Sequence, residues 1–544
     1  IKSLFTELST PKNTWFEKAK LLPRLKKIAS WMPKTVQRKG ICQQNIIMEP
    51  DLNRLPVLKC WPYDGGKFIT LPIVNTKDPE TGARNAGMYR MQILDKKTTA
   101  MHWHRHKTGA AHFKKYKSRK EIMPVTVCLG GDPVYTYAAT APLPEDVDEY
   151  LLAGFLRKKK VNLVKCVTNE LKVPEDVDIV IEGYIDTAED FVMEGPFGDH
   201  TGFYSLADYY PKFHVTCITH RNHAVYPATI VGIPPQEDAF IAKATERIFL
   251  TPLQITMLPE LLDMNLPPAG VAHNIAIVKI KKKYPGHALK IMNALWGAGQ
   301  MMFNKILIVC DAHADIHNYQ QVLDAVSRNV HPEPDIHFSK GTLDILDHAS
   351  DNMAFGAKMC IDATKKIQGE PQIHHQEAKE IKINSKDILF AFPEITDVNV
   401  SLAARGYPVI IFTTNKAMTG DFREFRQRIL HDPRFENIRF FVMADDVLDT
   451  ESLYYIAWNV SNNIEPVRDC LVENNKFFID GTAKITAYDH FKRDWPNVIC
   501  STEETIKLVD KKWEKYGLGE FISSPSLNFQ KMKIGEGAVA KFRK

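Results

Sequence analysis

The stretch from residue 55 to residue 231 consists of short apolar runs separated by turn-forming residues. LPVLKCW and KFITLPIVNT are apolar runs that predict strands, and MYRMQIL alternates with a period of two, which is typical of a strand with one buried face. EIMPVTVCL (121–129) ends at a Gly-Gly pair and predicts a buried strand. The strands VNLVKCVT, DIVIEGYI and KFHVTCITH follow it. Many short strands in succession predict an antiparallel barrel or sandwich.

Helical spacing of apolar residues marks three further segments. The first lies within residues 10–34 and follows a Thr start signal. The second begins near Pro144, has acidic residues early and basic residues late, and places Glu149 inside the helix. The third covers about residues 234–264 and begins with Glu237 and Asp238, which the helix dipole favours there.

The C-terminal half contains an internal repeat. Residues 306–335 and 440–469 align at one offset of 134, which pairs Asp311 with Asp445 and Pro332 with Pro466. Each copy predicts the order strand, helix, strand, helix, which is an α/β unit with a mostly parallel sheet. We therefore expect residues 395–490 to repeat the fold of residues 274–367. A packing or oligomer surface is the plainest role for the second copy.

Residues 85–113 form the first stretch with candidate chemistry. MYRMQIL and AMHWHRH alternate on either side of an Asp-Lys-Lys turn, which predicts a hairpin. The period of two places His102, His104 and His106 on one strand face. Three histidines on one face suggest a metal site, and a polar strand face with Trp103 packed opposite explains the same pattern.

The second such stretch is EGPFGD (194–199), where Pro and Gly predict a tight loop that carries two carboxylates. Glu194 and Asp199 can face one cavity there. We expect Phe191, Phe197, Phe203 and Tyr204 to surround the acids, and apolar surroundings raise a carboxyl pKa and suit it to proton donation. A surface turn with two solvated acids is the alternative.

Composition restricts the class of protein. The chain has 544 residues, enough for two to four domains, and a net charge of only +5 without a concentrated basic patch, which argues against nucleic-acid binding. Its nine cysteines are widely spaced, without a CxxC pair or a Cys/His cluster. An odd cysteine count, together with no long apolar run and no signal-peptide pattern, leads us to expect a reduced, cytoplasmic setting.

The motifs together resemble one enzyme family. NAGMYR, MHWHRHKTG, DEYLLAGFLR, IEGYI and EGPFGDHTG, in this order and spacing, are similar to the UbiD family of reversible aromatic and α,β-unsaturated acid decarboxylases. The resemblance covers roughly residues 50–370. It implies a mixed α/β and α+β fold, with a central split β-barrel of the flavin-reductase type that binds flavin and is flanked by α/β domains. Shorter family members resemble only the first C-terminal copy.

The resemblance implies the following division of the chain. It consists of an N-terminal α/β region (1–100), the split barrel (101–270), an α/β domain (271–370), a linker (371–394), the second α/β copy (395–510) and a tail (511–544).

The resemblance also implies site residues, position by position. The cofactor is prenylated FMN, whose phosphate is gripped by Mn²⁺ or Mg²⁺ together with K⁺. The metal ligands are then Asn85, His106 and Glu149, an oxygen and imidazole set that suits Mn²⁺ or Mg²⁺ beside phosphate. The flavin lies along Met88, Tyr89, Arg90, His102, Trp103, His104, Lys107 and Thr108.

The catalytic network implied by the resemblance is Glu194, Arg90 and Asp199. Arg90 presents a planar fork to a substrate carboxylate, Glu194 holds that fork, and Asp199 delivers a proton to the carbon that has lost CO₂. Arg105 and His104 depart from the more neutral neighbourhood expected before His106, which leaves the polarity of the flavin side open.

The implied function is non-oxidative decarboxylation of an aromatic or α,β-unsaturated acid. Quinone biosynthesis, with a polyprenyl-hydroxybenzoate or a naphthoate precursor, is one setting, and a small phenolic acid is another substrate class. The implied partners are a UbiX-type flavin prenyltransferase and further copies of the chain, as a dimer or hexamer, with peripheral membrane association if the substrate is polyprenylated. A conventional FMN-dependent oxidoreductase and a non-catalytic assembly scaffold are the alternatives.

Overall fold

The computed structural model describes residue 23 and residues 25–104, 107–144, 147–371, 380–416 and 422–542. The described residues fall into two compact units. The barrel unit comprises those up to Asp199 together with Tyr204–Val231, and the α/β unit comprises His200–Phe203 together with those from Gly232 onward. Most of the helix expected within residues 10–34 lies outside the described residues.

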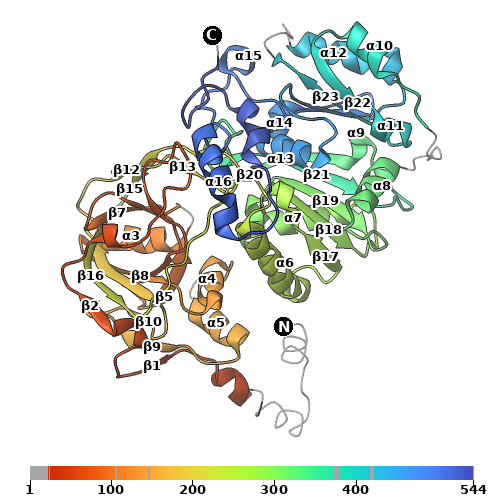
Figure 1. Cartoon of the computed structure of the whole chain (residues 1–544). Coiled ribbons are helices and arrows are strands. Elements are labelled where there is room, and N and C mark those ends of the chain that lie inside the picture. The colour runs from red at the N-terminus through yellow and green to blue at the C-terminus, as the bar shows by residue number, and fades with distance from the viewer. Residues whose placement is uncertain are drawn as a thin grey trace, which may run out of the picture. The chain divides into compact units, whose positions relative to one another are not determined.

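The barrel unit is organised around a nine-stranded sheet in which every pair of neighbours is antiparallel (Figure 1). The strand order is β3-β6-β7-β16-β11-β8-β4-β5, and β2 pairs with β16. The strands are β2 (Asn45–Ile47), β3 (Phe68–Ile69), β4 (Ile73–Lys77), β5 (Arg84–Met88), β6 (Met91–Ile93), β7 (Thr98–Met101), β8 (Met123–Leu129), β11 (Ile179–Ile185) and β16 (Lys212–His220). This curled half-barrel confirms the expected mixed fold with a split barrel. The sheet includes strands on both sides of residue 100, because β6 and β7 form the predicted hairpin.

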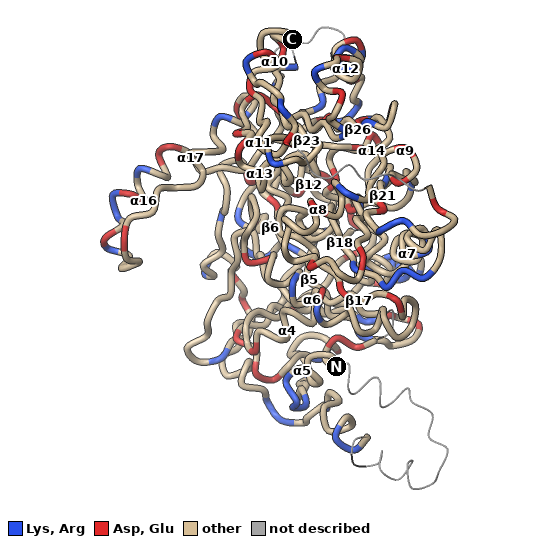
Figure 2. The backbone as a smooth tube through the Cα atoms, turned by 90° about the vertical axis from the view of Figure 1, so that its right-hand side faces the viewer, with Lys and Arg blue, Asp and Glu red and all other residues tan. Residues whose placement is uncertain are grey.

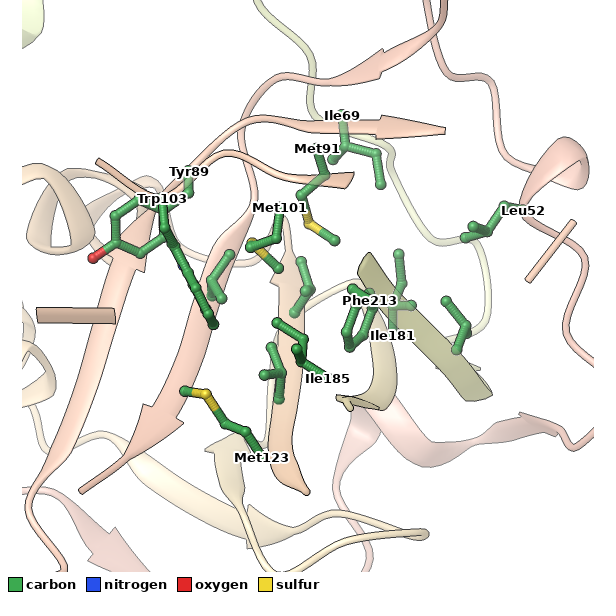
Figure 3. Close-up of a cluster of buried hydrophobic side chains, with 14 of the residues drawn as sticks. Leu52, Ile69, Tyr89, Met91, Met101, Trp103, Met123, Ile181, Ile185 and Phe213 are labelled. Atoms are coloured by element: carbon green, nitrogen blue, oxygen red, sulfur yellow. The ribbon is translucent and has the colours of Figure 1, made fainter. Parts of the chain in front are cut away.

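The inner face of the sheet carries the unit's main hydrophobic core. Met91, Met101, Ile181 and Phe213 come from four neighbouring strands and are almost completely buried. Because successive side chains of a strand point to opposite faces of the sheet, these apolar residues lie together on its inner face, as the period of two predicts. Figure 3 shows this cluster, with Tyr89 and Trp103 at one end of it.

Helices and short strands complete the barrel unit. They are α3 (Thr108–Arg119), α4 (Pro133–Thr140), α5 (Glu149–Arg157), β1 (Lys34–Thr35), β9 (Asn162–Lys165), β10 (Lys172–Pro174), β12 (Val192–Glu194), β13 (Phe197–Gly198), β14 (Tyr204–Ser205) and β15 (Asp208–Tyr210). Helix α5 begins later than the expected start near Pro144. Asp148 caps it by accepting a hydrogen bond from the Tyr150 amide, so Glu149 is its first helical residue.

The α/β unit begins with α6 (Glu237–Thr256) and contains two five-stranded sheets with the same topology. The first has the order β17-β18-β19-β21-β20, with β17 (Leu261–Asn265), β18 (Ile275–Ile280), β19 (Ile306–Asp311), β20 (Ile336–Thr342) and β21 (Phe355–Ala363). The second has the order β22-β23-β24-β26-β25, with β22 (Ile395–Asn399), β23 (Val409–Thr414), β24 (Phe440–Asp445), β25 (Cys470–Glu473) and β26 (Lys476–Asp480). The predicted repetition of the fold is therefore confirmed.

The helices repeat as well. The first copy contains α7 (His287–Trp296), α8 (Tyr319–Asn329) and α9 (Pro332–Asp335), and the second contains α12 (Phe422–His431), α13 (Leu453–Asn463) and α14 (Pro466–Asp469). The first copy starts at β17, earlier than the expected residue 274. Residues 261–264 were expected to be helical, and this expectation is wrong, because they belong to the edge strand β17, which pairs with β18.

The remaining elements of the α/β unit are α10 (Ser385–Ala391), α11 (Ser401–Ala404), α15 (Thr486–Asp489), α16 (Glu503–Tyr516) and α17 (Ser526–Phe529), so the expected linker is partly helical. Acidic and basic residues both occur along α16 (Figure 2). The end of the expected tail packs back on the unit: the Asn497 amide donates to Ala538 O and the Ala540 amide to Trp495 O. Among the described residues, no helix is long and apolar enough to span a membrane. All nine cysteines are free thiols.

Candidate active site

The three residues expected to form the catalytic network lie together in the barrel unit. Arg90 stands between β5 and β6, Glu194 ends β12, and Asp199 directly follows β13. Arg90 donates two hydrogen bonds to Glu194, from Nε to Oε1 at 2.7 Å and from Nη2 to Oε2 at 3.1 Å. Its Nη1 donates to Asp199 Oδ2 at 2.5 Å. One guanidinium thus holds both acids of the loop.

Burial makes this arrangement electrostatically strong. The side chains of Arg90, Glu194 and Asp199 are 8%, 0% and 11% exposed. Burial alone would raise the pKa of Glu194, but the charge of Arg90 and the hydrogen bonds that Glu194 accepts lower it to about 2. The same pairing raises the pKa of Arg90 against the opposing effect of its burial. Glu194 is therefore ionised, as a carboxylate paired with arginine is expected to be.

The aromatic environment expected around the two acids is only partly present. The Phe197 ring lies 4.6 Å from the Arg90 guanidinium carbon. Phe191 is 39% exposed and packs against Phe113 instead, and Phe203 belongs to the α/β unit. The environment of the Asp199 carboxylate is therefore set by its pairing with Arg90 as well as by apolar neighbours.

His102 joins the network as a fourth member. Its Nδ1 lies 3.0 Å from Glu194 Oε2, and its ring packs against Tyr210 with centroids 4.3 Å apart. Burial and the nearby charge of Arg90 lower the His102 pKa, so the neutral imidazole donates from Nδ1 to the carboxylate. Sequence reasoning considered His102 for a metal site and for the flavin, and missed this contact with Glu194.

Sequence reasoning also missed the residues that hold the loop backbone. The Gly195 amide donates to Gln92 Oε1 and the Gly198 amide to Asp64 Oδ1, both at 2.7 Å. Ser205 Oγ accepts from Arg90 Nη2 at 3.2 Å. These partners come from distant parts of the chain, and no motif marks them.

The expected flavin residues cluster at two junctions of the sheet. Met88, Tyr89 and Arg90 lie where β5 passes into β6. His102, Trp103, His104, Lys107 and Thr108 lie where β7 passes into α3, with Lys107 at the N-cap and Thr108 as the first helical residue. The strand expected to continue to His106 ends at Met101, because beyond Met101 the chain leaves the hairpin ladder.

Two buried nitrogens at the second junction suit a bound cofactor. Within the described residues, His102 Nε2 and Trp103 Nε1 have no hydrogen-bond partner. The Trp103 ring stands edge-on to Tyr89, with centroids 6.4 Å apart, and the two side chains adjoin in Figure 3. Buried polar groups are rarely left without a partner, so such atoms indicate a ligand that supplies one.

The structure describes two of the three expected metal ligands, Asn85 and Glu149. The Glu149 carboxylate accepts a hydrogen bond at 2.9 Å from the amide of Ala86, the residue next to Asn85 in β5. Burial raises the Glu149 pKa to about 7. His106 lies outside the described residues, and those described contain no group of three His, Cys, Asp or Glu side chains suited to a metal. The Asn85 side chain donates to Thr76 Oγ1 at 3.3 Å, and no contact joins it to the Glu149 carboxylate in the described residues. A largely buried carboxylate fits a hard divalent cation, which would offset the cost of burying the charge.

Comparison with known proteins identifies the family. The model of the 3-octaprenyl-4-hydroxybenzoate carboxy-lyase Rift-related domain, UbiD, matches residues 34–234. The model of the corresponding C-terminal domain matches residues 239–363 and 379–495. The chain belongs to the UbiD family. The two stretches of the C-terminal model coincide with the two copies of the repeat in this UbiD protein.

Relatives span most of the chain. A protein of Aquifex aeolicus is 48% identical over 357 residues, which cover 66% of this chain and 73% of the relative. A protein of Helicobacter pylori J99 is 36% identical over 515 residues, which cover 93% of this chain and 81% of the relative. The similarity therefore extends through the second copy.

The chain resembles solved structures of decarboxylases and of a UbiD-class enzyme. Vanillic acid decarboxylase from Sedimentibacter hydroxybenzoicus matches with a TM-score of 0.60 and 26% identity, over 72% of this chain and 84% of that chain. The UbiD-class enzyme HmfF from Pelotomaculum thermopropionicum, in complex with FMN, matches with a TM-score of 0.57 and 27% identity, over 65% and 80%. An evolved dimeric form of HmfF was solved in complex with prFMN. Family and neighbours together support a decarboxylase.

Proposed function

We propose that this UbiD protein is a prenylated-FMN-dependent, non-oxidative decarboxylase of an aromatic or α,β-unsaturated carboxylic acid. The observation that carries the proposal is the buried Arg90 shared between Glu194 and Asp199. A guanidinium can bind a substrate carboxylate, and an acid held beside it can deliver the proton that replaces CO₂. Two structural neighbours, solved in complex with FMN and with prFMN, support the cofactor.

The division of labour follows from the hydrogen bonds. Arg90 uses Nε and Nη2 on Glu194, so Glu194 fixes the plane of the fork. Nη1 has two hydrogens, and the described residues accept only one of them, at Asp199. The second can bind the substrate carboxylate.

The proton transfer depends on competition for Arg90. A substrate carboxylate on Nη1 weakens the pairing of Asp199 with the guanidinium, which makes a protonated Asp199 less costly. Asp199 then protonates the carbon from which CO₂ has left. Prenylated FMN, when bound, supplies the electron sink for breaking the carbon–carbon bond.

We assign the remaining candidates to holding the cofactor. Asn85, His106 and Glu149 would bind Mn²⁺ or Mg²⁺ at the flavin phosphate, with K⁺ nearby. His102 Nε2 and Trp103 Nε1 would meet polar atoms of the flavin, because their donor or acceptor capacity is unused in the described residues. Met88, Tyr89, His104, Lys107 and Thr108 complete the same two junctions.

The geometry favours this function over the two alternatives. Hydride transfer by an ordinary FMN oxidoreductase does not require a buried guanidinium paired with two carboxylates. A scaffold would not retain a buried ionic network without a use, because burying charges is costly.

The polyprenyl-hydroxybenzoate, naphthoate and phenolic acid classes all carry the carboxylate that Arg90 would bind. We also propose that a flavin prenyltransferase of the UbiX type supplies the cofactor and that the chain self-associates. If the substrate is polyprenylated, we propose that the protein associates peripherally with the membrane.

The cofactor itself gives the direct test. The protein is produced together with a flavin prenyltransferase, and the mass of the flavin released from it is measured. The proposal expects a prenylated FMN and CO₂ release from a panel of aromatic and α,β-unsaturated acids. Unmodified FMN together with nicotinamide-dependent turnover would support the oxidoreductase instead.

A further inference from the structure

The backbone of the EGPFGD loop is bonded directly after Glu194. The Gly195 amide donates to Gln92 Oε1 at 2.7 Å, and Gln92 is only 7% exposed. Gln92 follows Arg90 by two residues, and the side chains of both reach the same loop. One short segment therefore supplies the guanidinium that pairs with the Glu194 carboxylate and the amide oxygen that holds the backbone next to it.

A second side chain bonds the loop directly before Asp199. The Gly198 amide donates to Asp64 Oδ1 at 2.7 Å. The other oxygen of Asp64 accepts from the Cys60 and Trp61 amides at 3.1 and 2.8 Å, which fixes the aspartate in its own turn. Asp64 is 4% exposed, and a buried carboxylate that accepts three amide bonds is costly to displace.

The turn also meets the middle of the loop, because the Gly65 amide donates to Pro196 O at 2.7 Å. A Cβ on Gly65 would lie 2.0 Å from Gly195 O, and a Cβ on Gly198 would lie 2.3 Å from Trp61 Cδ1. Both positions therefore require glycine for close approach. Turn and loop are packed so closely that a shift of one must move the other.

We propose that Gln92 and Asp64 are positioning residues with separate tasks. Gln92 sets Glu194 and through it the Arg90 fork, whereas Asp64 sets Asp199. The proposal rests on the proposed function, in which Arg90 binds the substrate carboxylate and Asp199 delivers the proton. All of these contacts lie within the barrel unit. A misplaced fork weakens substrate binding and a misplaced acid slows proton transfer, because both need hydrogen-bond reach.

The first test replaces Gln92 by methionine in the full-length holoenzyme. Methionine keeps the length of the side chain and removes the acceptor of the Gly195 amide. We expect KM to rise about tenfold and kcat to change by less than about twofold, because the loss acts through Glu194. Gln43→Met is the matched control, since Gln43 is also 7% exposed and its Oε1 accepts from the Gly40 amide at 3.1 Å. It should leave both constants at the parent level.

The second test replaces Asp64 by asparagine. Asparagine has a single side-chain oxygen, and the turn offers it the two amides of Cys60 and Trp61. The Gly198 amide, which supplies only one bond, therefore loses its acceptor. We expect kcat to fall about tenfold while KM stays within about twofold of the parent value.

Asp178→Asn is the matched control for this variant. Asp178 is buried, and its two carboxylate oxygens accept from the Val225 amide at 3.0 Å and the Gly131 amide at 2.6 Å. The same substitution thus removes a bond of the same kind, held by residues far from the loop in sequence. It should change neither kcat nor KM.

Amide hydrogen exchange reports the hold on the loop without reference to activity. In peptides that cover residues 194–199, Gln92→Met and Asp64→Asn should each exchange about tenfold faster than the parent, and the two controls should not. If Asp64→Asn fails to fold, Gly65→Ala provides a second variant. Its Cβ would displace Gly195 O, so it should accelerate exchange in the same peptides.

Two outcomes overturn the proposal. Unchanged exchange in residues 194–199 would show that neither side chain holds the loop. Equal effects on KM and kcat in both variants, or a split in the reverse sense, would show that the tasks are not separate. Failure of the proposed function is distinguishable, because a parent protein without decarboxylase activity would still show the accelerated local exchange in the two variants.

Discussion

Arg90 donates from Nη1 to Asp199 Oδ2 over 2.5 Å, on the opposite side of the guanidinium from its two bonds to Glu194. This pairing was not expected from the sequence, which assigned Arg90 to Glu194 and a proton to Asp199. The arrangement makes Arg90 the residue through which a substrate carboxylate can influence the acid. The two roles of Arg90, binding and control of Asp199, are therefore linked.

The first prediction concerns Arg90→Lys. A lysine ammonium is a single point charge and cannot hold Glu194 with two parallel bonds while also reaching Asp199. We expect kcat/KM to fall by about 100-fold or more, as for other misplaced binding groups. Arg38→Lys is the control, because Arg38 is 68% exposed and makes a surface pair with Glu175. Activity near the parent level in Arg90→Lys would show that the planar fork is not needed.

The second prediction concerns the pH dependence of stability. The pKa of Glu194 is about 2 in the folded chain, below its ordinary value of 4.5. The stabilisation by ionised Glu194 is thus fully present above about pH 5, and is lost as the pH falls from about 4.5 toward 2. We expect Glu194→Gln to melt below the parent at pH 7, and the difference in Tm to shrink between pH 5 and pH 3. A difference that stays constant over this range would contradict the ion pair.

The sequence predicted what is local or periodic, and missed what depends on distant packing. The period of two located the β6–β7 hairpin, and the offset of 134 located the repeated sheets. The short apolar run at 261–265 suits helix and strand equally, so β17 was misassigned.

In the candidate site, too, the sequence motifs identified some residues and missed those brought together by distant packing. The motifs identified Arg90, Glu194 and Asp199, which the fold brings together. The contact of His102 with Glu194 joins residues 92 positions apart, and that of Gln92 with Gly195 joins residues 103 positions apart. Packing of whole elements determines such pairs, and single-sequence periodicity has no information on them.

The third prediction concerns Trp103. Its indole nitrogen is buried without a partner in the described residues, whereas the nitrogen of Trp61 donates to Val231 O at 2.7 Å. If the flavin supplies the missing partner, Trp103→Phe should weaken cofactor binding about fivefold to tenfold, the effect of one hydrogen bond. The increase in Tm on loading with cofactor should shrink accordingly.

Trp61→Phe is the control for this measurement. It breaks a bond within the protein, so it should lower the Tm of the apo and holo forms alike and leave the cofactor-induced increase unchanged. An unchanged increase in Trp103→Phe would remove Trp103 from the flavin site.

The fourth prediction concerns Glu149, whose buried carboxylate lies beside the backbone of β5. Glu149→Ala should lose both the divalent metal and most of the flavin, because metal and phosphate bind together, while the fold survives. Metal and flavin per chain are measured on purified protein. Glu170→Ala, which removes a surface partner of Lys165, should retain both. Full cofactor content in Glu149→Ala would show that the metal assignment is wrong.

The central claim is that Asp199 moves the proton, and exchange on a product analogue tests it without knowledge of the natural substrate. The loaded enzyme is incubated in deuterium oxide with a decarboxylated aromatic or α,β-unsaturated analogue, and deuterium at the carbon that carried the carboxylate is followed by NMR. Asp199→Asn keeps the size and most contacts of the side chain and removes the ionisable proton. The account predicts exchange in the parent and a rate lower by about 10²- to 10⁴-fold in Asp199→Asn, with flavin content unchanged. Equal exchange in the two proteins would contradict it.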